Sequence, residues 1–492
     1  MSGPDASTPD ASTHTASMGL NAPDDALLTA LRDLLGPAGV REASDAAAWL
    51  EEPRGRWHGR AAIVARPAST DEVAAVVKLC AAARVGIVPW SGGTGLVGGQ
   101  VKEDGLDPIL LSLDRMNRVR ASLPEEDALI VEAGMTLADV QKAAEAVGRL
   151  FPLSLASEGS CRIGGNLATN AGGVQVLRYG NARDLCLGIE AVMADGTVLH
   201  GLKTLRKDNA GYDIRHLLIG SEGTLGIITA AALKLVPRPA ETATAFCAVP
   251  GPAAALKLLH HLRGHFAETV SAFELMNRQG FDFLAEHCPE ARLPIAPPEW
   301  AVLTEVAGAK GAAMQGRLED ALASAMEAGL VEDAALATSL SQRDAMWQVR
   351  ELLPEANRRV GSVSSHDVSI PLSRIAAFIE DANAAIAAID PSLRINDFGH
   401  LGDGNLHYNI FPALGKTRAD HDHQRGAIKR AVHDLVHEAG GSVSAEHGIG
   451  RLKIDDLQRY GDPAKLAAMR AVKAALDPLG ILNPGAVLPA QG

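Results

Sequence analysis

The chain has 492 residues, 47 % of them hydrophobic and 21 % charged, which are globular values with room for two or three domains. A formal net charge of −13 argues against binding to nucleic acid or to anionic membrane surfaces, because both would repel the protein. No apolar run reaches transmembrane length. The five cysteines show no CxxC spacing and fit a reducing compartment, so we expect a cytoplasmic protein.

Residues 1–22 are predicted to form a disordered tail, because Pro-Asp-Ala-Ser-Thr occurs there twice and large apolar groups are few. The first basic residue is Arg32, so neither an Arg-rich presequence nor a secretory signal is indicated. Either Met1 or Met18 could be the start of translation.

Strands and helices alternate in the first half of the chain, which predicts an α/β or α+β fold. Helices are expected at 27–35, 70–83 and from 136, and strands at 61–66, 87–89, 109–113, 129–132 and 226–235. Residues 250–350 are Ala-rich and are predicted to be mostly helical, with strands at 272–275 and 301–306. Two further helices are expected at 424–439 and 463–476. We predict three parts after the tail: 23–238, 239–420 and 421–492.

A glycine cluster follows the expected strand at 87–89. Gly93 to Gly98 matches GxGxxG, but no helix can start there and no P-loop lysine follows, which disfavours an NAD-type dinucleotide site. Five glycines within residues 92–99 favour close backbone approach to phosphate oxygens, with a mobile surface loop as the alternative. Residues 158–173 mix glycines with asparagines, whose amides suit the edge of an isoalloxazine ring.

Near the C-terminus, His400 and His407 flank Asp403-Gly404, a hairpin signal between β-type runs at 394–398 and 406–411. The turn would bring both imidazoles together, and Glu446 supplies a carboxylate. Two histidines and one carboxylate with open positions are the ligand set of a catalytic divalent metal. The alternative is that these histidines only satisfy local hydrogen bonds.

These motifs, in this order, resemble the vanillyl-alcohol-oxidase (PCMH-type) flavoproteins, and among them the FAD-dependent D-2-hydroxyacid dehydrogenases that act on D-2-hydroxyglutarate, D-lactate or glycolate. The resemblance covers roughly residues 40–490 and includes Gly220 to Thr229. It implies an α+β fold with an FAD-binding domain of two α+β subdomains, a substrate domain with an antiparallel sheet, and a C-terminal helical segment that completes the active site.

The resemblance also implies an FAD site. Its residues would be Pro89, Gly92, Gly93, Thr94, Gly95, Leu96, Gly99, Glu132, Gly134, Ser160, Gly164, Asn166, Thr169, Gly173, Glu222, Gly223, Ile228 and Asn483. Attachment should be non-covalent, because residues 88–101 contain no histidine, and Cys161 is expected to be a buried small residue.

On the same basis, His400, His407 and Glu446 would bind the metal, with zinc, manganese and cobalt all compatible. His447 would be the general base, because an imidazole is suited to accept a proton at neutral pH. Arg350 would bind the substrate carboxylate, although its surroundings also fit a helix-surface arginine. Asn405 would orient substrate oxygens or the metal ligands.

The chain departs from the family at Ser365, where 2-hydroxyglutarate enzymes often carry a lysine for the distal carboxylate. His366, Arg358 and Arg359 are candidate substitutes. We favour D-2-hydroxyglutarate as substrate, with D-lactate or glycolate as the alternative, and an electron-transferring flavoprotein or quinone as acceptor; a homodimer is possible. Three other readings are a metallohydrolase, a catalytically silent flavin module and an NAD-dependent dehydrogenase.

Overall fold

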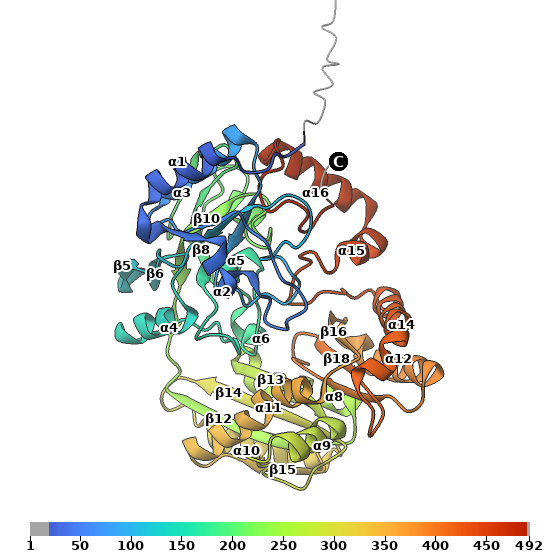
Figure 1. Ribbon diagram of the computed structural model, residues 1–492. Helices are drawn as coiled ribbons and strands as arrows, with labels where there is room; N and C mark the ends of the chain where they lie inside the picture. Colours follow the sequence, from blue (N-terminus) through green and yellow to red (C-terminus); the bar gives the residue numbers. More distant parts are fainter. Residues whose placement is uncertain (1–18, 490–492) are drawn as a thin grey trace, which may run out of the picture.

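The computed structural model describes residues 19–489. An N-terminal domain, coloured blue to green in Figure 1, lies above a second domain coloured yellow to orange. Most of the expected tail at 1–22 lies outside the described residues. Its last part is held in place, because the Asn21 amide donates to the carbonyl of Arg84 and Leu20 packs on the domain core.

The N-terminal domain has two α+β subdomains. The first contains a sheet in the order β1 (Val40–Glu42), β2 (Ile63–Ala65), β4 (Ile109–Ser112) and β3 (Ile87–Trp90), whose last three strands are parallel. Helices α1 (Asp25–Leu35) and α3 (Thr70–Ala83) pack on it. The α3 helix begins where predicted, because the Ser69 hydroxyl accepts from the Glu72 amide and caps it.

The second subdomain is an antiparallel sheet in the order β5 (Val119–Leu123), β6 (Ala128–Glu132), β10 (Ile227–Lys234), β8 (Cys186–Val192) and β9 (Val198–Gly201). Helices α4 (Leu137–Ala146) and α5 (Ile163–Ala168) share its core. The predicted α+β class is confirmed.

The second domain contains a four-stranded antiparallel sheet in the order β13 (Val270–Asn277), β14 (Trp300–Gly308), β12 (Glu241–Val249) and β15 (Asp333–Leu336). Alternate residues of β12 face opposite cores, as the period of a strand requires. Helices α8 (Pro252–Phe266) and α10 (Met314–Glu327) cover one face, and α9 (Arg278–His287) and α11 (Leu340–Val360) the other. Strands β12 and β15 were missed by the prediction.

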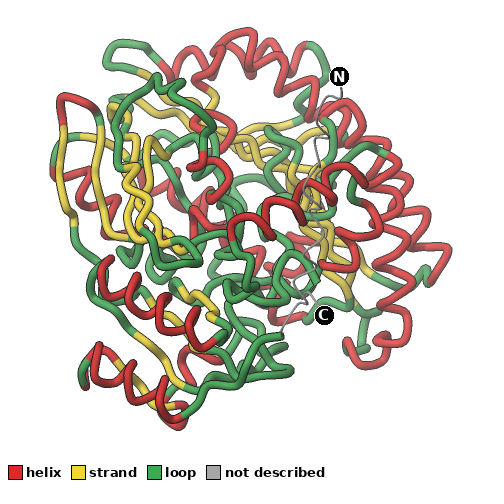
Figure 2. The backbone as a smooth tube through the Cα atoms, turned by 90° about the horizontal axis from the view of Figure 1, so that it is seen from above, coloured by secondary structure: helices red, strands yellow, loops and turns green. Residues whose placement is uncertain are grey.

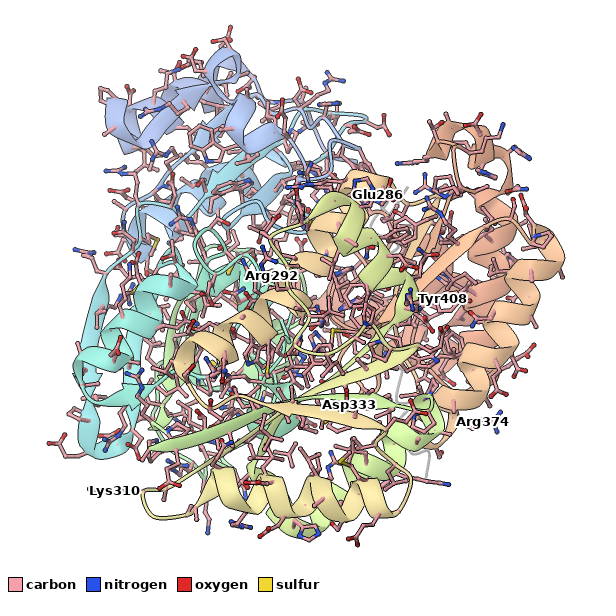
Figure 3. All side chains as sticks on the ribbon, turned by 90° about the horizontal axis from the view of Figure 1, so that it is seen from below. Glu286, Arg292, Lys310, Asp333, Arg374 and Tyr408 are labelled. Atoms are coloured by element: carbon pink, nitrogen blue, oxygen red, sulfur yellow. The ribbon has the colours of Figure 1, made fainter. Side chains whose placement is uncertain are left out.

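A smaller sheet of β16 (Ser364–Ser369), β18 (Asn405–Phe411) and β17 (Arg394–Phe398) continues this domain, and it contains the predicted hairpin. Helices α12 (Ile375–Ile389) and α14 (Arg425–Glu438) pack on it. The helices lie mostly towards the outside in Figure 2. Figure 3 shows Tyr408 of β18 among packed side chains, whereas Lys310, Asp333 and Arg374 lie on exposed surface.

The C-terminal segment joins the two domains. Helix α14 shares the core of the second domain, whereas α15 (Ile454–Tyr460) and α16 (Pro463–Leu476) return to the side of the N-terminal domain (Figure 1). Ile481 and Leu482 are buried in the N-terminal core, where the Ile87 amide donates to the Ile481 carbonyl. Within residues 19–489, no helix combines the length and the apolar character that a membrane span needs.

Candidate active site

The first glycine cluster is a loop that leaves the end of β3. No helix follows Gly98 before β4 begins at Ile109, as the sequence predicted. Gly92, Gly93 and Gly98 have φ angles of 87°, 70° and 70°, a region that favours glycine. A Cβ on Gly92 would lie 2.5 Å from the Ser160 carbonyl oxygen, so the loop can approach the second glycine block only without a side chain there.

The second glycine block lies directly against the first. The Gly165 amide donates to the Ser91 hydroxyl at 2.9 Å, and a Cβ on Gly164 would lie 2.9 Å from that of Ala133. Asn166 is only 5 % exposed, yet its Oδ1 has no hydrogen-bond partner among the described residues. A buried polar atom without a partner, beside a loop with open backbone, fits a polar ligand such as the flavin nucleotide.

Residues from the end of the chain close this loop. The Asn483 side-chain amide donates to the carbonyls of Gly99 at 3.0 Å and Glu222 at 2.9 Å. Arg451 donates to the carbonyls of Gly98 and Gly99, both at 2.9 Å. The structure therefore brings together three predicted cofactor residues that lie far apart in sequence.

Several other predicted cofactor residues already have protein partners. Burial raises the pKa of Glu222, and its carboxylate accepts from the amides of Ile449 and Gly450. The Glu132 carboxylate is bound by Arg118.

The remaining predicted residues lie along the same loops and strands. Pro89 lies against Gly223, Gly134 lies close to the Leu113 carbonyl, and Gly173 lies close to the Ser154 carbonyl. Hydrogen bonds join the Gly95 carbonyl to the Gln100 amide, Thr169 to the Gly165 carbonyl, Ser160 to the Ser157 carbonyl, and the Leu96 carbonyl to Arg56. Ile228 is part of the core, and Thr94 is half-buried in the loop.

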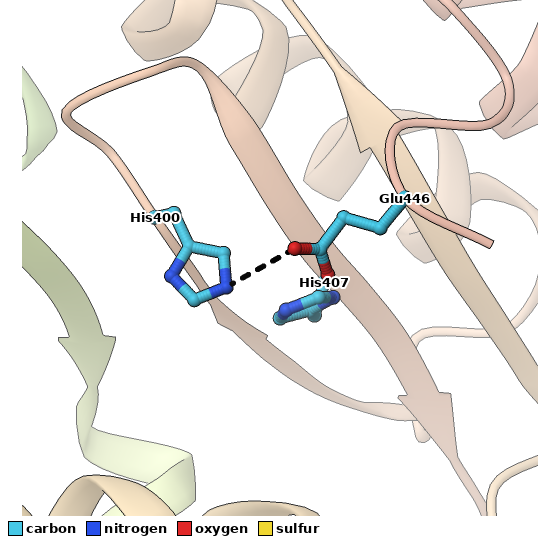
Figure 4. A group of neighbouring side chains, drawn as sticks. All are labelled: His400, His407 and Glu446. Atoms are coloured by element: carbon cyan, nitrogen blue, oxygen red, sulfur yellow. Dashed lines mark ion pairs between the residues drawn. The ribbon is translucent and has the colours of Figure 1, made fainter. Parts of the chain in front are cut away.

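The three predicted metal ligands meet at the mouth of the β17–β18 hairpin (Figure 4). His400 follows β17, His407 lies on β18, and Glu446 comes from the loop after α14. One ligand atom from each lies within 4.8 Å of the others, and His400 Nε2 is 3.7 Å from Glu446 Oε1. Two imidazoles and a carboxylate at this spacing fit a divalent cation that keeps coordination positions open.

Glu274 on β13 is a residue that the sequence reasoning missed. Its Oε1 is 2.8 Å from His400 Nδ1, and its Oε2 accepts from Arg350 Nε at 2.7 Å. The bond fixes the His400 ring with Nε2 directed to Glu446, as carboxylates commonly do for metal-binding histidines. A buried acid inside the apolar strand run Ala272 to Leu275 was the available signal.

Contact between Glu274 and His400 shifts their pKa values in opposite directions. Burial alone would raise its pKa, but His400 and Arg350 lower it to about 2. Burial would lower the pKa of His400, but Glu274 raises it to about 9. The buried Glu274 carboxylate therefore stabilises the charged form of His400.

Asp367 on β16 organises the other half of the site. Its carboxylate accepts from the backbone amides of Glu446 at 2.9 Å and His447 at 3.0 Å, and from the Asn405 side chain at 2.9 Å. It also lies 3.5 Å from His447 Nδ1 and 3.8 Å from His407 Nδ1. One buried carboxylate thus positions the predicted base and two residues of the metal region.

The three predicted catalytic residues are all placed at this site. Burial lowers the pKa of His447 to about 4, so its imidazole is neutral near pH 7. Arg350 is 5 % exposed, so it is not the surface arginine of the alternative reading, and no acceptor among the described residues pairs with its Nη groups. Among residues 19–489, no hydrogen-bond donor contacts the buried Asn405 Oδ1.

The expected substitutes for the missing lysine are wrong. Arg358 and Arg359 lie on the exposed end of α11, where both pair with Glu355. His366 is buried on the opposite side of β16 from Asp367, and its two ring nitrogens contact Ser364 and His433. These contacts leave none of the three for a substrate carboxylate.

Sequence comparison identifies relatives over most of the chain. Residues 61–201 match the FAD binding domain, and residues 238–487 match the C-terminal domain of FAD linked oxidases. The chain is 39 % identical to the mitochondrial D-2-hydroxyglutarate dehydrogenase of Bos taurus, covering 89 % of this chain and 80 % of that protein. It is 35 % identical to the D-2-hydroxyglutarate dehydrogenase of Xanthomonas citri pv. viticola, covering 87 % and 90 %.

Solved structures show the same fold at much lower identity. A p-cresol methylhydroxylase superposes with a TM-score of 0.73 at 16 % identity, covering 94 % of this chain and 96 % of that one. An alkyldihydroxyacetonephosphate synthase superposes with a TM-score of 0.71 at 18 % identity, covering 94 % and 86 %. The resemblance inferred from the motifs is confirmed: the chain belongs to the family of FAD-linked oxidases, together with the D-2-hydroxyglutarate dehydrogenases.

Proposed function

We propose that this FAD-linked oxidoreductase uses a divalent metal to oxidise a D-2-hydroxyacid, D-2-hydroxyglutarate in the first place, to the 2-oxoacid. One observation carries the proposal: the His400, His407 and Glu446 group lies beside His447 in a chain that also carries an FAD-binding domain. A metallohydrolase would have no use for the FAD domain, and a silent flavin module would have no use for a neutral, positioned imidazole.

Each residue has a task that its surroundings support. His447 accepts the hydroxyl proton, Arg350 pairs with the carboxylate beside that hydroxyl, and Asn405 helps to hold the metal region in place through its hydrogen bond to Asp367. The bound metal supplies Lewis-acid lowering of the hydroxyl pKa, and FAD supplies the hydride acceptor.

The donor set of two imidazoles and one carboxylate supports zinc, with manganese and cobalt compatible. Non-covalent FAD attachment is supported by the absence of histidine in residues 88–101. Cys161 is 2 % exposed and burial raises the pKa of its thiol, which disfavours a thiolate link to the flavin.

The acceptor is proposed to be an electron-transferring flavoprotein or a quinone, and the active unit a homodimer. The five cysteines are all free and buried, which supports the reducing, cytoplasmic location that we propose. D-lactate or glycolate is the second candidate substrate, because Ser365 removes the lysine that would favour a second carboxylate.

The decisive experiment is a panel of D- and L-2-hydroxyacids (glutarate, malate, lactate and glycolate series) assayed on the purified yellow protein with an artificial acceptor. We expect reduction with D-2-hydroxyglutarate, none with its L enantiomer, and loss of activity on EDTA treatment that added zinc or manganese restores. Oxidation of no 2-hydroxyacid would overturn the proposal, and full activity without metal would overturn its metal part.

A further inference from the structure

A strongly basic cavity of about 130 Å³ lies beside the site just described. Its cations come from three separate parts of the chain: Arg54 and Arg56, then Arg418, Arg425 and Lys429, then Lys453. No acidic side chain is among the described residues that line it, although the whole chain carries a net charge of −13. Such a concentration of one charge indicates an anion site.

Only some of these cations are neutralised by the protein. Lys429 pairs with Asp456 at 2.6 Å, whereas Arg54, Arg425 and Lys453 have no carboxylate within ion-pair distance among residues 19–489. Lys453 is only 8 % exposed, and its ammonium donates to the Val443 carbonyl at 2.7 Å. A buried ammonium without a counter-charge is costly, so a ligand that supplies negative charge is the natural partner.

The cavity adjoins the reaction centre. Ser365 and His366 form part of its wall, and the next residue, Asp367, holds the amides of Glu446 and His447. Ser365 lies two positions from Asp367 and shares its face of β16, so the cavity reaches the side of the strand that carries the reaction centre.

We propose that this cavity receives the distal carboxylate of a dicarboxylic 2-hydroxyacid, with Arg54, Arg425 and Lys453 supplying the positive charge that Ser365 does not. The inference rests on the proposed function and says which residues make the enzyme prefer dicarboxylic over monocarboxylic 2-hydroxyacids. A monocarboxylic acid would leave the buried Lys453 without a counter-charge, and a buried unpaired group discriminates strongly between substrates. Because Arg54 belongs to the N-terminal domain and Arg425 to α14, the substrate would bridge the two domains.

The test compares two substrates of equal length, D-2-hydroxyglutarate and D-2-hydroxypentanoate, with an artificial acceptor and the FAD-loaded protein. In Arg54→Gln and in Arg425→Gln, we expect the ratio of kcat/KM for the dicarboxylate to that for the monocarboxylate to fall at least about tenfold, mainly through KM for the dicarboxylate. Arg54→Lys should recover part of the loss. Arg358→Gln, which removes a surface arginine paired with Glu355, is the matched control and should leave the ratio unchanged.

A binding measurement keeps this test separate from that of the proposed function. Glutarate lacks the hydroxyl and cannot be oxidised, so calorimetry should show binding to the wild type that weakens about tenfold in Arg54→Gln. An unchanged substrate ratio, or equal losses for both substrates, would overturn the inference. Glutarate binding without oxidation of any 2-hydroxyacid would refute the proposed function and leave the cavity assignment standing, whereas displacement of glutarate by phosphate with no effect on the ratio would assign a free-anion site instead.

Discussion

The proposed flavin side and the proposed metal side of the active centre are built differently. The flavin side uses backbone, where Gly92, Gly93 and Gly98 adopt positive φ angles. The metal side uses charged side chains, which the buried carboxylates of Glu274 and Asp367 hold in place. Holding a large cofactor requires space and many weak donors, whereas proton and metal chemistry requires a few charges whose pKa values are set by their neighbours.

The largest effect should come from removing the base on the metal side. His447→Ala is expected to lower turnover more than about a hundredfold, because general-base catalysis contributes at least that much. If the two sides are independent, the visible flavin spectrum and the metal content should stay at wild-type levels. Full activity in the variant would refute the assignment of His447 as the base.

A substitution at Glu274, which contacts His400, tests whether this carboxylate is needed to position the proposed metal ligand. Glu274→Gln keeps the size of the side chain but removes the charge that faces His400 and Arg350, so metal affinity or activity should fall about 10- to 100-fold. Metal content measured by mass spectrometry checks this. The half-buried Glu241 offers a control, since its carboxylate accepts from the amides of Gly311 and Met314 and Glu241→Gln should retain the metal.

Gly92→Ala tests the flavin side. The added Cβ would meet the Ser160 carbonyl at 2.5 Å and force a positive φ on a non-glycine residue, a strain of about 1–3 kcal/mol. We expect FAD affinity to fall about tenfold with metal content unchanged, as measured by flavin release and fluorescence. Gly211→Ala, at a positive φ with open space around it, separates this contact from the backbone strain. Equal FAD loss in both variants would contradict the close-approach explanation.

The smallest effect on activity is expected at Asp397, a buried carboxylate that, unlike Glu274, pairs with no cation in the described part of the chain. Burial raises its pKa from 3.8 to about 7, and its Oδ2 has no partner among the described residues. Below pH 4 this group therefore leaves the free energy of unfolding unchanged. As the pH rises towards 7 the group lowers that free energy, and above pH 7 the loss is roughly 4 kcal/mol. Asp397→Asn should unfold at higher temperature than the wild type at pH 8 and at nearly the same temperature at pH 4; a gap independent of pH would refute this explanation.

Local signals in the sequence predicted local structure well. The bounds of α3 and α16 agree with the structure because Ser69 and Asp462 cap them within one turn. The meeting of His400, His407 and Glu446 could be predicted because a tight turn joins the two histidines, and because Glu446 stands in a recognisable motif. The two histidines, like each capping residue and its helix, are close together in the sequence.

Contacts between distant segments could not be predicted in the same way. Glu274 reaches His400 across 126 positions, and Asp367 reaches the Glu446 amide across 79. Strand β12 was missed because an Ala-rich sequence carries no strong strand preference before its neighbours are known. The grouping of Arg54 with Arg425 depends on how the two domains meet, which no local pattern encodes.

The link between Asn483, Arg451 and the glycine loop also sets an order of events during synthesis. Residues 91–99 leave the ribosome hundreds of residues before Asn483, whose amide binds the Gly99 carbonyl and whose neighbours Ile481 and Leu482 fill the N-terminal core. The core of the N-terminal domain is therefore complete only after residues 481–483 have been synthesised. Changes at residues 481–485 should reduce the yield of FAD-loaded protein before they affect its chemistry.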